Sequence, residues 1–423
     1  MENDVLSAEQ FGFQKQKNTQ DAILFIQSYI LEALEAKRTP IAIMLDYSAA
    51  FDCVPHERLL NKVQNAGVVG GALRLIRSYL SDRSQRLRCG TVTSRPMNVR
   101  RGVPQGGSLS ALFFSLYIND LLRKTDSTVT YVGYADDVTL LMNFDGSLNK
   151  RTIEGSLRQV AQWSKRNGLL LNSTKSSYTV FSSNQTPERP VIRVHDETCE
   201  APESCACSRI PNVETSRYLG IELDEKLNWK QHVASLKTRL RAATCSIVKL
   251  RRSCTLRTST LIYKALFESY LRYGLLAYGA AFETTITSLQ SLQNNIIRKL
   301  TRSPLTERLE PLYKRCNILP IKKLFLQCLL SECLLRNRPR SETALLELTA
   351  VHDYSTRQAK LIRPLKTRLV RTEKFYLNRY VSLHNLLNDE LRNPSVMSKS
   401  KMKKSIKCFV DEIDIATLDT FLF

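Results

Sequence analysis

Several features of secreted, membrane-spanning and repeat proteins are missing from this sequence. The first residues, MENDVLSAEQ, are polar and acidic, unlike a secretory or mitochondrial targeting segment. No apolar run has the length that crossing a bilayer requires, and no internal repeat of fixed period is present. The eleven cysteines are odd in number and irregularly spaced, which predicts reduced thiols instead of a disulfide framework. Together these absences predict an intracellular protein, nuclear or cytoplasmic, without a membrane partner.

Negative charge is also scarce. The chain carries 62 Lys and Arg against 40 Asp and Glu, which leaves a formal net charge of +22. An excess of this size favours a polyanionic partner, most often nucleic acid. A well-solvated basic surface and contact with anionic lipid are the alternatives. The length of 423 residues and the hydrophobic content of 43% are those of a globular protein with two or three domains.

The pattern of apolar residues divides the chain near residue 225. Before this point strand-like and helical segments alternate, whereas Trp229 to about Asn337 is nearly all helical, with Arg and Lys between apolar rows. The remainder is basic, and its segment SKSKMKKSIK has five lysines in ten residues. Such a segment is typical of either a nuclear address or a nucleic-acid-binding tail.

Short strands and helices are expected before residue 225. The run IAIML, residues 41–45, predicts a strand that stops at Asp46, and YVGYADDVTLL, residues 131–141, predicts a hairpin whose turn holds Asp136 and Asp137. This order predicts an α+β fold with a mainly antiparallel sheet and helices on one of its faces. Further strands are expected within 90–99 (a pair), 169–181 (two) and 217–223, and helices at about 19–36, 56–80, 109–124 and 148–167.

The three aspartates predict a metal site. If the strand ending at Asp46 lies beside the hairpin that turns at Asp136 and Asp137, three carboxylates converge and repel one another. Carboxylate oxygens are hard ligands that suit Mg²⁺, and a pair of such ions about 4 Å apart is the arrangement that nucleotidyl transfer requires. Asp is also frequent in turns for conformational reasons, so the adjacent pair alone does not decide between the two interpretations.

Four ordered motifs resemble the palm of reverse transcriptases: LDYSAAFD, RGVPQGGSLSALFFSLYINDL, YADD and LLLNSTKSSYTVFS. More narrowly, the chain from about Leu6 to about Asn337 is similar to the enzymes of non-LTR, LINE-type retrotransposons of the jockey-like group. The segments that match the thumb of that group, in order, are YLGIELDEKLNW, YLRYGLLAYG, LQSLQNNIIRKL and LYKRCNILPIKKL. The resemblance implies a right-hand polymerase fold with partial fingers in residues 1–40, a palm in 41–225, a helical thumb in 226–337 and a basic C-terminal region in 338–423.

The resemblance implies RNA-directed DNA synthesis. The partners would be an RNA template, a DNA primer and deoxynucleoside triphosphates, and the cofactors two Mg²⁺ ions, or Mn²⁺ in their place. Asp46 and Asp136 would bind the metal directly, with Asp137 as the partner carboxylate. Phe51 would lie under the sugar and exclude a ribose 2′-hydroxyl, although a plain core phenylalanine is the alternative.

The resemblance also implies roles around these residues. In the loop GVPQGGS, Gln105 would contact the incoming nucleotide or the template, and Gly106 would allow the backbone to approach closely. Lys175 would stand near the leaving pyrophosphate, or simply face solvent. Lys15 and Lys17 would be fingers residues that approach the triphosphate. Tyr218, Leu219 and Gly220 would form the primer grip, and an ordinary strand end is the alternative for these three.

The chain departs from the family pattern at several points. Gln14 stands where arginine is more common, and Ala111 replaces the usual proline after Leu-Ser. Little fingers sequence precedes QFGF, and no endonuclease or ribonuclease H segment is recognisable, so we expect an N-terminally truncated copy. A catalytically incomplete remnant that only binds nucleic acid is therefore the second interpretation. An RNA-dependent RNA polymerase, the third, is disfavoured by Phe51 and by the thumb motifs.

One group of cysteine and histidine residues lies outside these motifs. It consists of His195, Cys199, Cys205 and Cys207. The spacing H-x3-C-x5-C-x-C does not match a usual zinc motif, and on that ground we expect no metal there.

Overall fold

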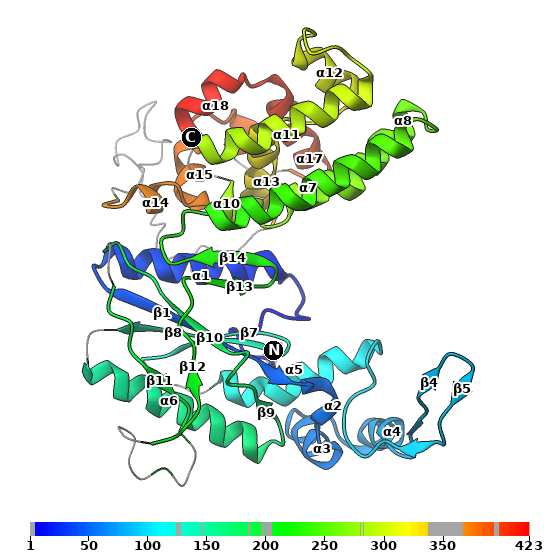
Figure 1. Cartoon of the computed structure of the whole chain (residues 1–423), viewed down its shortest axis with the longest axis vertical. Helices are drawn as coiled ribbons and strands as arrows, with labels where there is room; N and C mark the ends of the chain where they lie inside the picture. Colours follow the sequence, from blue (N-terminus) through cyan, green and yellow to red (C-terminus); the bar gives the residue numbers. More distant parts are fainter. Residues whose placement is uncertain are drawn as a thin grey trace. The chain divides into compact units, whose positions relative to one another are not determined.

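The chain divides into two structural units, which are described separately. The first comprises Met1–Ile26 and Lys37–Ser216, and the second Gln27–Ala36 and Arg217–Phe423. The computed structural model (Figure 1) describes residues 5–123, 128–144, 147–184, 187–195, 199, 205–279, 281, 283–336, 367–392 and 397–422.

The first unit is built on a four-stranded antiparallel sheet. The order across the sheet is β10–β1–β8–β7, and all three pairings are antiparallel. Both faces are buried, since Ile41 and Ile43 on one face and Ala42 on the other are each 0% exposed. This double burial explains why the sequence of the central strand is continuously apolar instead of alternating. The strands are β1 (Thr39–Leu45), β7 (Thr130–Tyr134), β8 (Asp137–Phe144) and β10 (Ser177–Val180).

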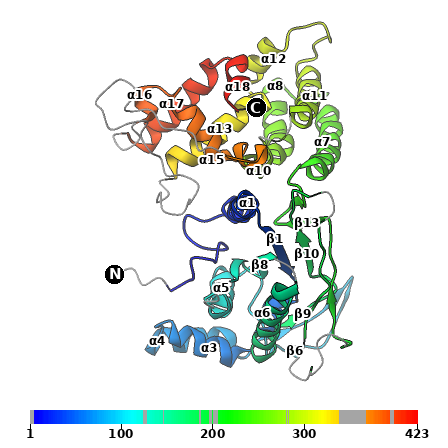
Figure 2. The ribbon, with the colours of Figure 1, turned by 90° about the vertical axis from the view of Figure 1, so that its left-hand side faces the viewer.

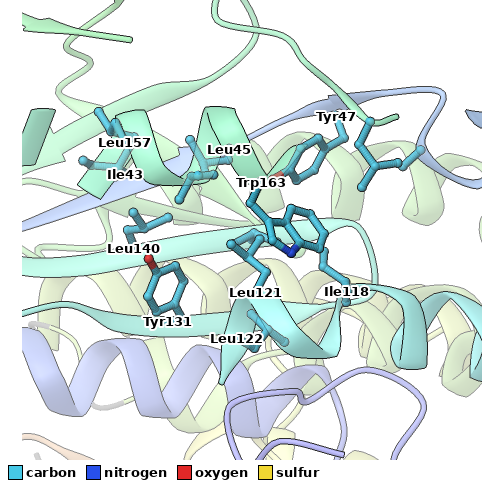
Figure 3. Close-up of a cluster of buried hydrophobic side chains, with 14 of the residues drawn as sticks. Ile43, Leu45, Tyr47, Ile118, Leu121, Leu122, Tyr131, Leu140, Leu157 and Trp163 are labelled. Carbon is cyan, nitrogen blue, oxygen red and sulfur yellow. The ribbon is translucent and has the colours of Figure 1, made fainter. Parts of the chain in front are cut away.

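Helices α5 (Ser108–Leu122) and α6 (Ser147–Arg166) cover one face of this sheet, as Figure 2 shows. The core between them and the strands contains Ile43, Leu140 and Trp163, which Figure 3 draws as a continuous apolar cluster. Most apolar side chains of α5 are buried in this core, whereas Leu109 and Leu112 are exposed. The other helices that lie wholly in the unit are α2 (Ala50–Cys53), α3 (His56–Asn65) and α4 (Gly70–Leu80), and α1 (Thr19–Glu35) begins in this unit and ends in the second.

Three of the expected elements differ in the structure. The single helix expected over 56–80 is two helices, because Gly67 and Gly70 adopt positive φ angles of 96° and 61° between α3 and α4. The two strands expected within 90–99 do not pair with each other. Each pairs with a strand that precedes residue 90, in two successive hairpin pairings. The strands are β3 (Ser84–Gln85), which pairs with β6 (Met97–Asn98), and β4 (Arg88–Cys89), which pairs with β5 (Val92–Thr93).

The strand expected over 217–223 is a hairpin. Strands β13 (Thr215–Tyr218) and β14 (Ile221–Asp224) are joined by Leu219 and Gly220, whose φ angles are 44° and 81°. Two consecutive positive φ angles are typical of the tight two-residue turn that matches strand twist. The other short pairs are β2 (Tyr47–Ser48) with β9 (Leu170–Leu171), and β11 (Ile192–Arg193) with β12 (Arg209–Ile210).

The second unit is mainly helical, as the sequence predicted. Its first group of helices consists of α7 (Lys230–Arg251), α8 (Leu256–Tyr263), the π-helical segment η1 (Lys264–Glu268), α9 (Ser269–Arg272), α10 (Leu275–Tyr278), α11 (Glu283–Thr301), α12 (Leu309–Cys316) and α13 (Ile321–Leu335). The boundary expected at 337/338 lies outside the described residues. The last group consists of α14 (Val370–Glu373), α15 (Tyr376–His384), α16 (Asp389–Arg392), α17 (Lys399–Glu412) and α18 (Ile415–Leu422).

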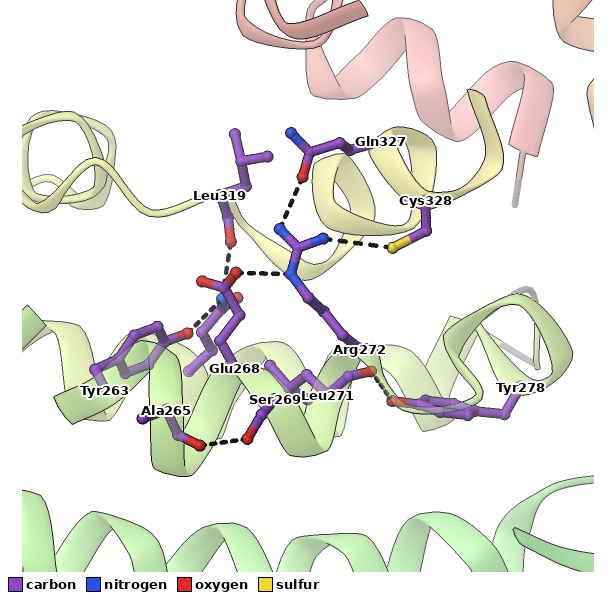
Figure 4. Close-up of polar contacts among 11 residues, drawn as sticks. Tyr263, Ala265, Glu268, Ser269, Leu271, Arg272, Tyr278, Leu319, Gln327 and Cys328 are labelled. Atoms are coloured by element: carbon purple, nitrogen blue, oxygen red, sulfur yellow. Dashed lines mark hydrogen bonds and ion pairs between the residues drawn. The ribbon is translucent and has the colours of Figure 1, made fainter. Parts of the chain in front are cut away.

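A polar network inside this helical unit links α9 to α13 (Figure 4). The guanidinium of Arg272 donates to Glu268 Oε1 at 2.7 Å and to Gln327 Oε1 at 2.7 Å. The buried Tyr278 hydroxyl donates to the Leu271 carbonyl oxygen at 2.5 Å. Glu268 is only 7% exposed, so the ion pair with Arg272 offsets part of the cost of burying its carboxylate.

The predicted α+β class with an antiparallel sheet is confirmed. Among the helices that the structure describes, none combines the length and the apolarity that a membrane crossing demands. All eleven cysteines lie in the described ranges, and the structure places no disulfide among them.

The core predicts a large cost for truncating its central strand. Leu140 is 0% exposed, so Leu140→Ala leaves a cavity and should lower the free energy of unfolding by about 2–5 kcal/mol in urea denaturation. Leu87→Ala is the matched control, because this side chain is 75% exposed and its loss should change stability by less than about 0.5 kcal/mol. Equal effects of the two substitutions would contradict the assigned core.

Candidate active site

The pairing of two strands brings Asp46 and Asp137 together. Strands β1 and β8 run antiparallel with Leu45 opposite Val138. One step further along the same register, Asp46 stands opposite Asp137. Opposed residues in antiparallel strands have Cα atoms roughly 4.5–5.5 Å apart. Two acidic residues far apart in the sequence therefore meet at one end of the sheet.

A tight turn holds Asp136 next to them. Tyr134 pairs with Asp137, so Ala135 and Asp136 form a two-residue connection between β7 and β8. Ala135 has a φ of 58°, a conformation that favours glycine, and its N–H donates to the buried Gln10 Oε1 at 3.3 Å. The same Gln10 oxygen accepts from the Gly12 N–H at 2.9 Å. Gln10 thus supports the turn.

The QFGF segment approaches this turn very closely. A Cβ atom on Gly12 would lie 2.6 Å from the Ala135 nitrogen, so only glycine fits there. The backbone of Phe11 donates to the Gly133 carbonyl oxygen at 2.7 Å, which adds a second connection. Gln10 was not singled out from the sequence, because a single glutamine in a polar loop carries no signal of burial.

A second loop holds the end of β1. The Asp46 N–H donates to the Ser176 hydroxyl at 3.0 Å, and the Asp46 carbonyl oxygen accepts from the Asn172 N–H at 2.9 Å. The Asn172 side chain in turn accepts from the backbone N–H groups of Thr174 and Lys175 at 3.2 and 3.1 Å, a turn typical of asparagine. The backbone of Lys175 is therefore tied to the aspartate, while its side chain is exposed.

The electrostatics of the aspartates reflect their proximity. Burial raises the pKa of Asp136, and the Asp46 carboxylate adds to the rise, while a backbone hydrogen bond opposes it. Desolvation, followed by the charges of Asp136 and Asp46, raises the pKa of Asp137 to about 6, although its side chain reaches the surface. As they stand, the three carboxylates are not compact enough to enclose an ion. A hard divalent cation would offset their repulsion and could draw them together.

Phe51 lies in the short helix α2, which follows β1 and β2 in the chain. Its ring stacks on Phe114, with centroids 4.4 Å apart and an interplanar angle of 23°. The Phe51 carbonyl oxygen accepts from the Val103 N–H at 2.9 Å, which connects helix α2 to the loop GVPQGGS. Phe51 is half-buried and not enclosed like its partner Phe114, so one part of the ring remains accessible.

The glycine-rich loop offers open backbone. Gly106 has a φ of 84° and nothing within 4 Å of the place a Cβ would occupy. Gln105 is exposed, and its amide donates to the two carboxylate oxygens of Asp52 at 2.9 and 3.1 Å. Asp52, the second acidic residue of LDYSAAFD, was not predicted to act at the site, yet it orients Gln105.

The remaining predicted residues differ in their surroundings. Lys15 is exposed, whereas the Lys17 ammonium donates to the carbonyl oxygens of Ala8 and Gln10. The Lys17 ammonium also lies 4.9 Å from the Phe11 ring centroid.

The three residues predicted as a primer grip lie in the second unit. Tyr218 is 3% exposed, and Leu219 and Gly220 form the turn of the β13–β14 hairpin. The Tyr273 hydroxyl donates to the Leu219 carbonyl oxygen at 2.5 Å. Leu219 and Gly220 also line a cavity of about 320 Å³, together with residues of α7 and α9 that include Arg239 and Tyr270.

Comparison with known proteins identifies the class. Residues 1–223, just over half of the chain, match the family described as reverse transcriptase (RNA-dependent DNA polymerase). The chain belongs to this family, and the family predicted from the motifs is confirmed.

The curated relatives come from mobile elements. The chain is 28% identical over 299 residues to the probable RNA-directed DNA polymerase from transposon X-element of Drosophila melanogaster. The aligned region covers 69% of this chain and 32% of the relative. The chain is 26% identical over 305 residues to the RNA-directed DNA polymerase from mobile element jockey of the same species, with coverages of 70% and 32%. The chain thus spans about a third of the length of these relatives.

A solved structure is also similar at low identity. A telomerase from Candida tropicalis, in complex with a fragment of telomeric RNA, matches 77% of this chain and 51% of its own chain. The TM-score is 0.35 and the sequence identity 12%, values too low to bear on function.

The raised pKa of Asp137 predicts how stability depends on pH in the absence of divalent cations. The folded protein keeps the Asp137 proton up to about pH 6, whereas the unfolded chain loses it near 3.8, so folding stability falls as pH rises between these values. Asparagine does not ionise, so Asp137→Asn removes this pH-dependent loss of folding stability. Its stability should therefore rise relative to the unsubstituted protein between about pH 4 and 6 and then stay constant.

Urea denaturation in EDTA across this pH range measures the effect. We expect a gain of no more than about 1 kcal/mol, because solvent screens an exposed carboxylate. Asp82→Asn, in an exposed turn, is the control and should give a flat difference. A difference for Asp137→Asn that is flat or falls with pH would contradict the proximity of the carboxylates.

Proposed function

We propose that the chain catalyses RNA-directed DNA synthesis by transfer of a nucleotidyl group to a primer 3′-hydroxyl. The observation that carries the proposal is the register of β1 on β8, which sets Asp46 beside Asp136 and Asp137. Family membership supports the same chemistry, since the matched residues include all three aspartates. Within this proposal, residues 1–40 form partial fingers, 41–225 the palm, 226–337 the thumb and 338–423 a basic C-terminal region.

Asp46 and Asp136 would hold the divalent metal, with Asp137 beside them. Their carboxylate oxygens suit Mg²⁺, with Mn²⁺ as a substitute, and we propose two ions. Bound there, the ions would lower the pKa of the primer hydroxyl and neutralise the departing pyrophosphate. The protein's own part is to keep the carboxylates in place, which the hydrogen bonds to Asp46 and to Ala135 do without substrate.

The nucleotide would lie between Phe51 and the glycine-rich loop. Phe51 would lie under the sugar and leave no space for a ribose 2′-hydroxyl. Gln105, positioned by Asp52, can donate and accept at the nucleotide or template, and Gly106 leaves the backbone open to close approach. Lys175 would carry positive charge toward the pyrophosphate. Lys15 would approach the triphosphate, and Lys17 would do so after leaving its backbone partners.

The template and primer would contact the basic helical unit. Helix α7 buries an apolar row that includes Leu236 and Leu240, while Arg239, Arg241 and Lys249 are exposed. Contacts of this kind are made mostly to phosphate and weaken with salt. Tyr218, Leu219 and Gly220 would grip the primer end. A protein that only binds nucleic acid would keep these contacts without synthesis, and this is the second candidate function.

Removing one metal-binding carboxylate tests the catalytic proposal. With a poly(rA)/oligo(dT) template, dTTP and Mg²⁺, Asp136→Asn should lower the rate of synthesis by roughly three orders of magnitude, because several kcal/mol of charge stabilisation are lost. Binding of the same duplex, measured by fluorescence anisotropy, should change little, since phosphate contacts supply most of the affinity.

Asp82→Asn is the matched control and should retain the full rate. Equal background-level synthesis by the unsubstituted protein and by Asp136→Asn, with duplex binding intact, would reject the polymerase and leave the nucleic-acid-binding protein.

Phe51 predicts selection against ribonucleotides. Phe51→Val shortens the side chain and opens space for a 2′-hydroxyl, so the preference for dTTP over UTP, measured as the ratio of kcat/KM values, should fall by roughly 10- to 100-fold. Phe114→Leu removes the stacking partner and keeps Phe51 itself, so it should lower stability and leave the ratio nearly unchanged. If Phe51→Val left the preference for dTTP over UTP unchanged, Phe51 would be a core residue without a role in sugar selection.

A further inference from the structure

Four side chains outside the polymerase motifs converge on one point of the first unit. They are His195, Cys199, Cys205 and Cys207, called here the thiol–imidazole cluster. Their potential ligand atoms, one nitrogen and three sulfurs, all lie within 4.8 Å of one another. His195 Nδ1 is 3.4 Å from both Cys199 Sγ and Cys205 Sγ. Among the described residues, no other group of histidine, cysteine and acidic side chains is compact enough to enclose an ion, and this includes the three aspartates of the candidate active site.

The two nitrogen–sulfur distances are close to those of a tetrahedral zinc site, and the widest pair of the cluster, within 4.8 Å, would have to close by up to about 1 Å. With Zn–N near 2.05 Å and Zn–S near 2.3 Å, the edges of the tetrahedron are about 3.6 Å from nitrogen to sulfur and about 3.8 Å from sulfur to sulfur. The nitrogen–sulfur distances of 3.4 Å need a change of only a few tenths of an ångström to reach these values. One imidazole and three thiolates form a closed four-ligand set of the kind that structural zinc prefers.

A buried carboxylate lies next to the ring nitrogen of His195 that does not face the cysteines. The other ring nitrogen of His195, Nε2, lies 3.4 Å from Glu154 Oε2, and both side chains are less than a tenth exposed. Glu154 Oε1 accepts from the Arg193 N–H at 3.2 Å, which fixes the carboxylate. His195 Nε2 has no hydrogen bond as it stands, so a small approach of the two side chains would be needed for the ring to donate to Glu154 and direct Nδ1 at a metal.

The strand register explains how an irregular spacing becomes a compact group. In the β11–β12 hairpin Ile192 is opposite Ile210, and the Val194 N–H donates to the Ser208 carbonyl oxygen at 2.9 Å. One step further, His195 stands opposite Cys207. We expected no metal here because the four residues are irregularly spaced along the sequence. In the folded chain, pairing of the two strands brings residues together whatever their spacing in the sequence.

We propose that the thiol–imidazole cluster binds one structural Zn²⁺ ion. Three cysteines bind as thiolates and His195 as neutral imidazole, so binding releases up to three protons to solvent. Soft sulfur ligands distinguish this site from the oxygen ligands of the aspartates, which favour Mg²⁺. The site leaves no position open for a substrate, so its role is structural.

The ion would add a cross-link to a short hairpin that otherwise depends on the burial of Ile192 and Ile210 in the core. Strands β11 and β12 pair over only two residues each, too few for an isolated hairpin to be stable. Through His195 and Glu154 the metal connects this hairpin to α6. Arg158, also on α6, donates to the Cys199 carbonyl oxygen at 2.6 Å. Zinc binding would therefore fasten the segment between β10 and β13 onto the helix that covers the sheet.

Metal content tests the proposal on the full chain. After purification under reducing conditions and brief washing with EDTA, elemental analysis should find about one zinc per chain. Cys205→Ser and Cys207→Ser should lose most of it, whereas Cys245→Ser, an exposed cysteine on α7, should keep it. Asp136→Asn should also keep it, which separates this site from the aspartates. Zinc absent from the unsubstituted chain, or equal in Cys205→Ser and Cys245→Ser, would overturn the proposal.

Two further measurements do not depend on the folding of the cysteine variants. Replacement of zinc by Co²⁺ in the unsubstituted chain should give thiolate-to-cobalt charge-transfer absorption and the visible bands of tetrahedral cobalt. Oxygen ligation alone gives no such charge-transfer band, and its absence would also overturn the proposal. Glu154→Gln should weaken zinc binding by roughly 10- to 100-fold in a chelator competition, and an unchanged affinity would remove Glu154 from the site.

Discussion

The pairing of β1 with β8 is the constraint on which the candidate active site depends. Leu45 opposite Val138 fixes where the two strands end relative to each other, and Asp46 and Asp137 follow as the next opposed pair. A shift of one residue would turn the apolar side chains of β1 to the wrong face. Because both faces of the sheet are buried, the core enforces this register, and the core thereby positions the carboxylates.

Backbone hydrogen bonds hold the carboxylates near one another although their negative charges repel. Repulsion and burial raise the pKa values of Asp136 and Asp137, so their proximity costs stability when no cation is near. Backbone hydrogen bonds from Asp46 to the loop at 172–176, and from Ala135 to Gln10, offset this cost. Under the proposed function, a site held in this way would need little reorganisation to bind a metal and a nucleotide, since polymerases lower their barrier mainly by positioning charge.

Sequence patterns predicted the parts of the fold that depend on local periodicity and on recognisable motifs. The buried strand before Asp46, the hairpin at Asp136 and the helical second unit each have a clear apolar pattern. The break at Gly67 and the hairpin turn at Leu219 were missed because a change of backbone direction leaves only a weak local signal. Gln10 and Asp52 were not predicted to act at the site, since each depends on a partner that comes close only after folding. The cysteines and histidine of the thiol–imidazole cluster were noticed as a group, but their spacing along the chain gave no sign that the fold brings them together.

The most direct test of the central claim is the position of a bound metal. Crystals of the protein soaked with Mn²⁺ and a deoxynucleoside triphosphate would locate the ion by its anomalous scattering. Our account predicts an ion within roughly 2–2.3 Å of carboxylate oxygens of both Asp46 and Asp136. Carboxylates of Asp46 and Asp136 more than about 10 Å apart, farther than two bridging ions can span, would contradict it.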